Sequence, residues 1–379
     1  MDFTLSEAQD ELAGLARKIL AERDTPWADL ASAGVLAAGL PEEDGGAGLG
    51  LLEQCSVLVE IGRAVSDVPY LASIVLGAGA IAGFGSPDQR QRWAAPAGQG
   101  SVVLTAALPE EDGDDPRFPS TRAERAGRGW RLSGVKTAVP AAPRADLFLV
   151  PAATSDGVVV FLASPSDHGV TVEPQQLTDF AAAGRVVLAG VTLDDDRVLG
   201  PGRGAEITDW LVSRGTVGLC AMQAGVIERA LELTAEYARN RVQFGRPIGS
   251  FQAVAQRLAD AFIDVEAVRL TMWQAAWLLA SGDEGDAAAG TAVATAKFWA
   301  AEAGHRVAHT AVHVHGGLGI DMSYPVHRYF VAAKHHEFAL GGATAQLRRI
   351  GSDLASGLPS ATLTGLSATS NELDWSPDR

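Results

Sequence analysis

The sequence predicts a mainly α-helical α+β protein in which a β-sheet domain separates two helical regions. Residues 1–100 and 204–356 place apolar side chains at helical spacing, whereas residues 101–203 contain short β-branched runs between clusters of Gly, Pro and Asp. The chain has 379 residues, more than a single hydrophobic core usually supports. We therefore expect an N-terminal helical domain (1–100), a β-sheet domain (101–203) and a C-terminal helical bundle (204–356).

The N-terminal region begins with a recognisable helix start. Ser6 and Gln9 have the spacing of a capping box, and helically spaced apolar residues follow them. The segment 41–50 is rich in Gly and acidic residues, which predicts a loop. Helical spacing returns over 57–64 and 71–81.

The middle region is predicted to form strands, each short and rich in β-branched residues. Five runs have this character: 102–104, 147–150, 158–162, 170–172 and 186–188. The acidic segment 110–116 is predicted to be a surface loop. Together the runs favour a small β-domain.

The C-terminal region carries two long apolar stripes, over 219–237 and 254–272, with spacings of three and four residues. A third helix is expected over about 286–315, because Gly316 and Gly317 follow as a helix stop. Such long stripes predict a four-helix bundle with further apolar faces left for other subunits. Residues 357–379 lack any period and predict a disordered tail.

Composition excludes several classes of function. The net charge of −16 argues against general nucleic-acid binding, so a phosphate-bearing ligand would need a local basic cluster such as Arg239, Arg241 and Arg246. Cys55 and Cys220 form neither a disulfide framework nor a metal-ligand spacing. No signal peptide or membrane-spanning stretch is evident, and a cytoplasmic protein is expected.

Two motifs could bind a nucleotide. The segment 241–249, followed by Gln252, can be an ordinary turn between helices, or a clamp in which Arg binds a pyrophosphate and Phe covers a ring. The segment 315–319 can be a helix stop, or a glycine strip that a phosphate approaches closely. Each motif alone is weak evidence.

Taken together, the two motifs resemble the C-terminal domain of the acyl-CoA dehydrogenases. The segments 130–136 (Trp-Arg-Leu-Ser-Gly-Val-Lys), 41–50, 324–326 and 333–334 are similar to other motifs of that family, and the resemblance covers about residues 3–352. It implies a helical domain, a β-domain and a four-helix bundle, usually assembled as a tetramer. The implied reaction is FAD-dependent α,β-desaturation of an acyl-CoA in lipid metabolism, with FAD lying between subunits.

The resemblance also implies which residues contact the adenosine and pyrophosphate of an FAD held by a neighbouring subunit. These cofactor-binding candidates are Arg241, Gln243, Phe244, Gln252, His313, Gly316, Gly317 and Gly319.

The sequence departs from the family pattern where the catalytic base is expected. The usual Glu position is Leu340, and the alternative position, before the Arg of the first bundle helix, is Ser213. Neither side chain can act as a base near neutral pH. Glu337 is a weak candidate for a displaced base. The segments expected to face the flavin ring are also altered, to Ala138-Val139-Pro140 and to 105–109.

The chain therefore resembles the base-lacking subunit of actinobacterial α2β2 acyl-CoA dehydrogenases, some of which act on sterol side chains. It would complete the cofactor site of a catalytic partner and be inactive alone. Three alternatives stay open: a self-sufficient, self-associating dehydrogenase that uses Glu337, a flavin oxidase or monooxygenase on the same fold, and a scaffold without flavin.

Three histidines, His305, His309 and His313, share one face of the predicted third helix. This spacing is compatible with a metal site, but it offers no fourth ligand. We expect helix surface and subunit contacts instead, and no metal.

Overall fold

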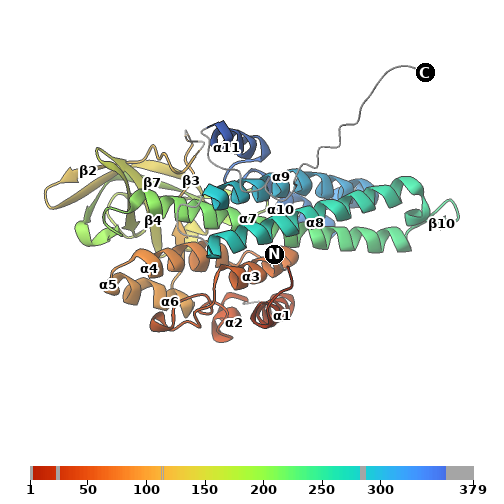
Figure 1. The fold of residues 1–379 in the computed structure, drawn as a ribbon, viewed down its shortest axis with the longest axis horizontal. Helices are drawn as coiled ribbons and strands as arrows, with labels where there is room; N and C mark the ends of the chain where they lie inside the picture. Colours follow the sequence, from red (N-terminus) through yellow and green to blue (C-terminus); the bar gives the residue numbers. More distant parts are fainter. Residues whose placement is uncertain (1–2, 23–25, 112, 114, 282–286, 356–379) are drawn as a thin grey trace, which may run out of the picture.

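The computed structural model describes residues 3–22, 26–111, 113, 115–281 and 287–355. The β-domain lies at one end of the molecule, and a bundle of long helices projects away from it (Figure 1). The N-terminal helices pack along one side of the bundle. The expected order of helices, sheet and helices is confirmed, whereas the predicted tail over 357–379 lies outside the described residues.

The N-terminal helical region consists of two longer helices, α1 and α3, and several shorter ones. Ser6 Oγ accepts a hydrogen bond from the Gln9 N–H at 3.2 Å, and Gln9 Oε1 accepts one from the Ser6 N–H at 2.7 Å, so the predicted capping box is present. The segment 71–81 is helical, but its first part is a π-helix. The elements are α1 (Glu7–Glu22), α2 (Pro26–Ser32), η1 (Glu42–Asp44), α3 (Leu51–Ala64), η2 (Tyr70–Ala78), α4 (Gly79–Phe84), α5 (Pro87–Gln89), η3 (Arg90–Ala94) and α6 (Ala95–Gly98).

The middle region forms one eight-stranded sheet in the order β6-β7-β3-β2-β4-β5-β8, with β1 paired to β4. Most pairs are antiparallel, while β1 and β2 run parallel to β4. The strands are β1 (Leu104–Ala106), β2 (Arg122–Ala126), β3 (Gly129–Pro140), β4 (Leu147–Thr154), β5 (Gly157–Ala163), β6 (Val170–Gln176), β7 (Ala182–Asp194) and β8 (Val198–Leu199). Two short helices, η4 (Ala142–Arg144) and η5 (Asp195–Arg197), join some of them.

Three details of the sheet differ from the sequence prediction. The strand expected over 102–104 begins only at Leu104, because the Val103 N–H donates to the side chain of Asp146 at 2.8 Å. Strand β2 was not expected, since its sequence is mostly polar. Glu110, the first residue of the predicted surface loop, is instead buried against Lys136, with 2.7 Å between Oε1 and Nζ.

The C-terminal region is a bundle of three long helices and one shorter one, with a further helix beside it. Its elements are α7 (Gly204–Asn240), β9 (Val242–Gln243), β10 (Arg246–Pro247), η6 (Ile248–Ser250), α8 (Gln252–Ser281), α9 (Ala287–His315), η7 (Gly316–Ile320), α10 (Val326–Phe338) and α11 (Ala343–Ala355). The third helix ends at His315 as predicted, and Gly316 follows with φ +61°.

Two glycines let the N-terminal region and the bundle approach backbone to backbone. A Cβ atom on Gly62 of α3 would lie 2.0 Å from the Met222 carbonyl oxygen of α7. A Cβ on Gly225 of α7 would lie 2.0 Å from the Val59 carbonyl oxygen of α3. Any larger side chain would force the two helices apart, so this close contact fixes the N-terminal helices on the bundle.

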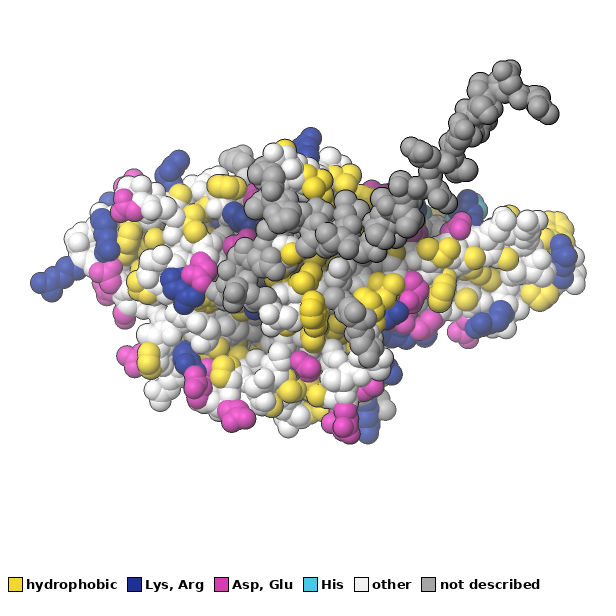
Figure 2. All heavy atoms as spheres, in the orientation of Figure 1, with side chains coloured by type: hydrophobic (Ala, Val, Ile, Leu, Met, Phe, Trp, Pro, Cys, Tyr) yellow, Lys and Arg dark blue, Asp and Glu magenta, His cyan; other side chains and the backbone are white. Residues whose placement is uncertain are grey.

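The bundle keeps apolar side chains on its surface, as the long stripes predicted. Phe262 and Ile263 of α8 are 59% and 64% exposed, and Figure 2 shows hydrophobic side chains along the projecting bundle. No described helix is long and apolar enough to span a membrane.

Candidate functional site

A largely apolar cavity of about 430 Å³ lies where the three regions meet. Its walls come from η2, the end of β1, the end of β3, the connection between β6 and β7, one face of α7 and the end of α10. The apolar part of the wall includes Leu71, Leu76, Leu108, Leu219, Met222, Phe338 and Leu340.

Leu340 occupies the position in this wall at which the family pattern predicts a catalytic carboxylate. It follows α10 in the left-handed region, with φ +54°, and its side chain reaches over Gly215 of α7. A Cβ atom on Gly215 would lie 3.2 Å from Leu340 Cδ1. The alternative base position, Ser213, is buried in α7 and is not part of the cavity wall. Both base positions of the family pattern are therefore without a basic group.

Glu337 points to a different surface from Leu340. Its carboxylate lies 2.5 Å from Lys334 Nζ and 3.3 Å from His305 Nδ1, and it is not part of the cavity wall. His305 belongs to α9, so Glu337 joins α10 to α9. This geometry favours the polar helix-end role over that of a displaced base.

The residue before Glu337 does line the cavity, and its environment is unusual. His336 is 4% exposed, and its Nδ1 lies 3.2 Å from Gln223 Oε1. Burial lowers the pKa of His336 to about 3, so the ring is neutral. Gln223 is itself held, because its amide nitrogen donates to the carbonyl oxygens of Ala300 and Ala333 at 3.1 and 3.3 Å.

The segment that would face a flavin ring uses its hydrogen-bond donors within the chain. The Ala138 N–H donates to Gln175 Oε1, and the Ala141 N–H donates to the Ala182 carbonyl, both at 2.7 Å. Pro140 has no N–H. Its carbonyl oxygen already accepts the Thr105 hydroxyl at 2.7 Å. These residues therefore lack the free hydrogen-bond donors that a planar polar ring, such as a flavin ring, would need.

The first nucleotide motif forms an exposed hairpin at the far end of the bundle (Figure 1). Phe244 and Gly245 occupy its two turn positions with φ +53° and +76°, the pattern of a type I′ turn. Phe244 is 91% exposed, and Arg241 and Gln243 are also exposed. Gln252 opens α8 directly after the hairpin.

The second nucleotide motif lies at the same end. His315, the last residue of α9, stacks on Tyr237 near the end of α7, with 4.4 Å between ring centroids. Gly316 and Gly317 are exposed, and Gly319 is buried. His313 is exposed shortly before them. The structure thus brings the cofactor candidates of both motifs to one end of the bundle.

Helix α7 separates this end from the cavity. Gly215 lies in the cavity wall and Arg241 directly follows the helix. At a rise of about 1.5 Å per residue, the helix places Arg241 about 39 Å from Gly215 and about 28 Å from Met222, the cavity residue of α7 nearest to the hairpin. A single bound dinucleotide does not span these distances, so the two ends cannot serve the same FAD molecule within one chain.

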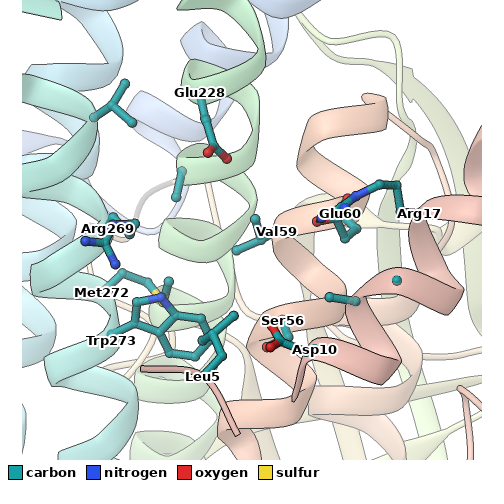
Figure 3. Close-up of a pocket in the computed structure, with 14 residues that line it drawn as sticks. Leu5, Asp10, Arg17, Ser56, Val59, Glu60, Glu228, Arg269, Met272 and Trp273 are labelled. Atoms are coloured by element: carbon teal, nitrogen blue, oxygen red, sulfur yellow. The ribbon is translucent and has the colours of Figure 1, made fainter. Parts of the chain in front are cut away.

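A second hollow of about 450 Å³ lies between the N-terminal helices and the bundle (Figure 3). Apart from Asp10, the charged groups of this hollow form ion pairs: Glu60 with Arg17, and Glu228 with Arg63, each at 2.7 Å. Arg269 pairs with Glu266 at the same distance. We interpret this hollow as a seam between two domains.

Comparison with protein-family models decides the family. The acyl-CoA dehydrogenase N-terminal domain matches residues 4–101, and the acyl-CoA dehydrogenase C-terminal domain matches residues 202–355. The chain is also 49% identical over 376 residues to acyl-CoA dehydrogenase FadE27 of Mycobacterium tuberculosis, covering 94% of this chain and 99% of that one.

The chain belongs to the acyl-CoA dehydrogenase family.

Solved structures of the same family agree in fold. The ChsE4-ChsE5 complex from Mycobacterium tuberculosis contains a chain that is 49% identical, with a TM-score of 0.88, covering 94% of this chain and 99% of that one. A variant of the Tcur3481-Tcur3483 steroid ACAD matches at 39% identity with a TM-score of 0.86, covering 93% and 99%. The predicted resemblance to the acyl-CoA dehydrogenases is confirmed.

Sequence reasoning missed the buried polar residues of this acyl-CoA dehydrogenase. Lys297 is fully buried in α9, and its Nζ donates to the carbonyl oxygens of His336 and Glu337 at 2.8 and 3.1 Å. A signal existed for Lys297, since it is a lone charge within an Ala-rich helical stretch. Gln223 and His336 gave none, because their pairing joins residues far apart in the sequence.

The described residues contain no group of three or more His, Cys, Asp or Glu side chains that could hold a metal ion. The rings of His305 and His309 are tilted against each other with 4.3 Å between centroids, and His305 also contacts Lys334 and Glu337. His313 is not part of this contact. The three histidines thus lie on the helix surface.

Proposed function

We propose that this chain is the base-lacking subunit of an FAD-dependent, heteromeric acyl-CoA dehydrogenase, and that it completes the nucleotide site of a catalytic partner in an α2β2 assembly. The observation that carries the proposal is Leu340: the wall position at which the family pattern predicts a carboxylate holds an aliphatic side chain over Gly215. Without a base, no α-proton can be removed from an acyl-CoA bound in this cavity.

The positions of the motifs support a shared cofactor. Members of this family are FAD flavoproteins, and the flavin supplies the hydride acceptor of the reaction. The exposed hairpin and the glycine strip lie at the bundle end remote from this chain's own cavity. Arg241, Gln243, Phe244 and Gln252 would hold the nucleotide part of an FAD whose ring lies in the partner, together with His313, Gly316, Gly317 and Gly319.

The segment expected to face the flavin ring also supports a cofactor site shared between two subunits. The N–H groups of Ala138 and Ala141 are bound within the chain, and Pro140 has none. This chain would therefore lend half of a cofactor site without holding a flavin ring of its own.

The relatives support a substrate class and a compartment. One structure similar to this chain is described as a steroid ACAD, and another is a complex of two named subunits. We propose a steroid-type acyl-CoA as the substrate of the complex. Cys55 and Cys220 are free and buried, which suits a reducing cytoplasm.

The decisive experiment compares FAD content by visible absorbance in the chain purified alone and purified with a co-expressed catalytic partner. We expect a nearly colourless chain and a yellow complex with one FAD per pair of unlike chains. A yellow chain with stoichiometric FAD when purified alone would overturn the proposal. Replacing the predicted base of the partner by Gln serves as the control, because it should abolish activity and leave FAD in place.

A further inference from the structure

His336 brings to the cavity wall a ring nitrogen for which the described residues supply no hydrogen-bond partner. Nδ1 of His336 lies 3.2 Å from Gln223 Oε1, whereas Nε2 has no hydrogen-bond partner among the described residues. The side chain is almost fully buried and forms part of the cavity wall. A polar atom in such surroundings calls for a partner from outside the chain.

The neighbours of His336 decide which hydrogen-bonding role Nε2 takes. The amide nitrogen of Gln223 faces two carbonyl oxygens, so its oxygen must face His336. His336 Nδ1 must then carry the proton that this oxygen accepts. Burial keeps the ring neutral, since the pKa of His336 is lowered to about 3. Nε2 is therefore a hydrogen-bond acceptor at neutral pH.

The charged groups of the wall are balanced. Arg144 lies 3.2 Å from Asp67, and Lys334 lies 2.5 Å from Glu337. Asp179 Oδ2 lies 3.9 Å from His335 Nε2 and its Oδ1 accepts the Ala181 N–H. With two basic and two acidic side chains in the wall, neither sign of ligand charge is favoured.

A second hollow adjoins the cavity and adds to the space that a ligand can occupy. This neighbouring hollow of about 440 Å³ shares six wall residues with it: Ser66, Asp67, Asp179, Ala181, Met222 and His336. His336 thus stands where two hollows adjoin, and most of the first hollow is lined by apolar side chains.

We propose that this cavity binds an uncharged, largely apolar molecule whose hydroxyl or N–H group donates a hydrogen bond to Nε2 of His336. The inference rests on the proposed function, because a flavin ring in the same cavity would take its space. It gives the base-lacking subunit a ligand site of its own. The acceptor Nε2 selects a ligand with one hydrogen-bond donor, and the apolar wall selects a ligand that is otherwise apolar.

The test uses two fluorescent probes of the same ring system, 2-naphthol and 2-methoxynaphthalene, which differ in one hydrogen-bond donor. Their affinities for the full-length chain are measured by titration calorimetry. We expect one molecule of 2-naphthol per chain, bound about tenfold more tightly than 2-methoxynaphthalene. Equal affinities, or no binding of 2-naphthol, would overturn the inference.

Three variants locate the binding. His336→Phe keeps a ring and removes the acceptor, so the two probes should bind it equally. Leu219→Trp narrows the cavity and should abolish binding of both probes. Gly14→Trp places the same bulk in the separate hollow of Figure 3, where a Cβ on Gly14 meets nothing within 4 Å, and should change neither affinity.

A second measurement covers the case in which His336→Phe does not fold. In the wild-type chain with isotope-labelled histidine, 2-naphthol should shift the imidazole Nε2 resonance of His336, and 2-methoxynaphthalene should not. An unchanged resonance at saturating 2-naphthol would refute the assignment. The proposed function fails separately: stoichiometric FAD in the isolated chain would refute it, whereas a colourless chain that does not prefer 2-naphthol refutes only this inference.

Discussion

The Nζ atom of Lys297 lies 2.8 Å from the carbonyl oxygen of His336, so a buried ammonium group of α9 caps the end of α10. The Glu337 carbonyl oxygen is a second acceptor at 3.1 Å. These carbonyls belong to the last turn of α10, where no further helical N–H groups follow. The contact fixes the end of α10, from which the chain continues along the cavity wall to Leu340.

Replacing Lys297 by Met should destabilise the protein by about 1–3 kcal/mol for each carbonyl left buried without a donor. The measurement is the urea midpoint of the full chain at neutral pH. Lys334→Met is the matched control, since it removes an ammonium group from the same region but from a partly exposed ion pair, which contributes about 0–1 kcal/mol. Equal effects of the two substitutions would contradict the capping role.

Glu337→Gln should leave the turnover of the assembled complex nearly unchanged. Its carboxylate is bound to Lys334 and His305 and is not part of the cavity wall. Loss of a general base typically lowers the rate by about 10² to 10⁴. A fall of that size in a steady-state assay would make Glu337 the base, and would favour a self-sufficient dehydrogenase.

Arg241→Ala should weaken FAD retention by the complex about ten- to a hundredfold. Phosphate oxygens would lose charge-assisted hydrogen bonds worth roughly 1.5–3 kcal/mol each, at about 1.4 kcal/mol per decade of affinity. Flavin fluorescence gives the affinity, and activity should recover with excess FAD because the partner's base is untouched.

Arg239→Ala is the control for that variant. Arg239 is exposed in the last turn of α7, close to the hairpin, and carries the same charge. A similar loss in both variants would indicate a general effect of charge on FAD binding. Unchanged affinity in Arg241→Ala would mean that the hairpin is an ordinary turn.

Lys136→Met should destabilise the β-domain strongly. The substitution leaves the Glu110 carboxylate, whose side chain is 5% exposed, without its buried partner, a loss that typically costs about 3–5 kcal/mol. Thermal unfolding of the purified chain measures the effect. Arg185→Met, which breaks partly exposed pairs with Glu111 and Glu173, should change stability by about 1 kcal/mol or less.

The same pair predicts a pH dependence. Glu110 is desolvated, but Lys136 and Thr121 stabilise its charge, and the net effect lowers its pKa from 4.5 to about 2. The folded state therefore binds fewer protons than the unfolded state in that interval. The contribution to stability is complete above pH 4.5 and is lost as the pH falls towards 2. Urea midpoints should show a steeper acid loss in the wild type than in Glu110→Gln; parallel curves would contradict this.

The sequence by itself determined the order of the domains, the capping box at Ser6, the end of α9 at His315 and the resemblance to the acyl-CoA dehydrogenases. These features rest on spacings within short segments, since helix periods, caps and glycine stops involve neighbouring residues. The missing base was visible for the same reason, because Leu340 lies a fixed distance after a recognisable motif.

Only the tertiary structure decided which residues surround the cavity and which point away from it. Glu337 and Leu340 are close in the sequence, yet one contacts α9 and the other lines the cavity. The pairs formed by His336 with Gln223 and by Lys136 with Glu110 join separate elements, so no local pattern predicts them. The length of α7 places the hairpin and the cavity at opposite ends, because a straight helix converts sequence distance directly into separation in space.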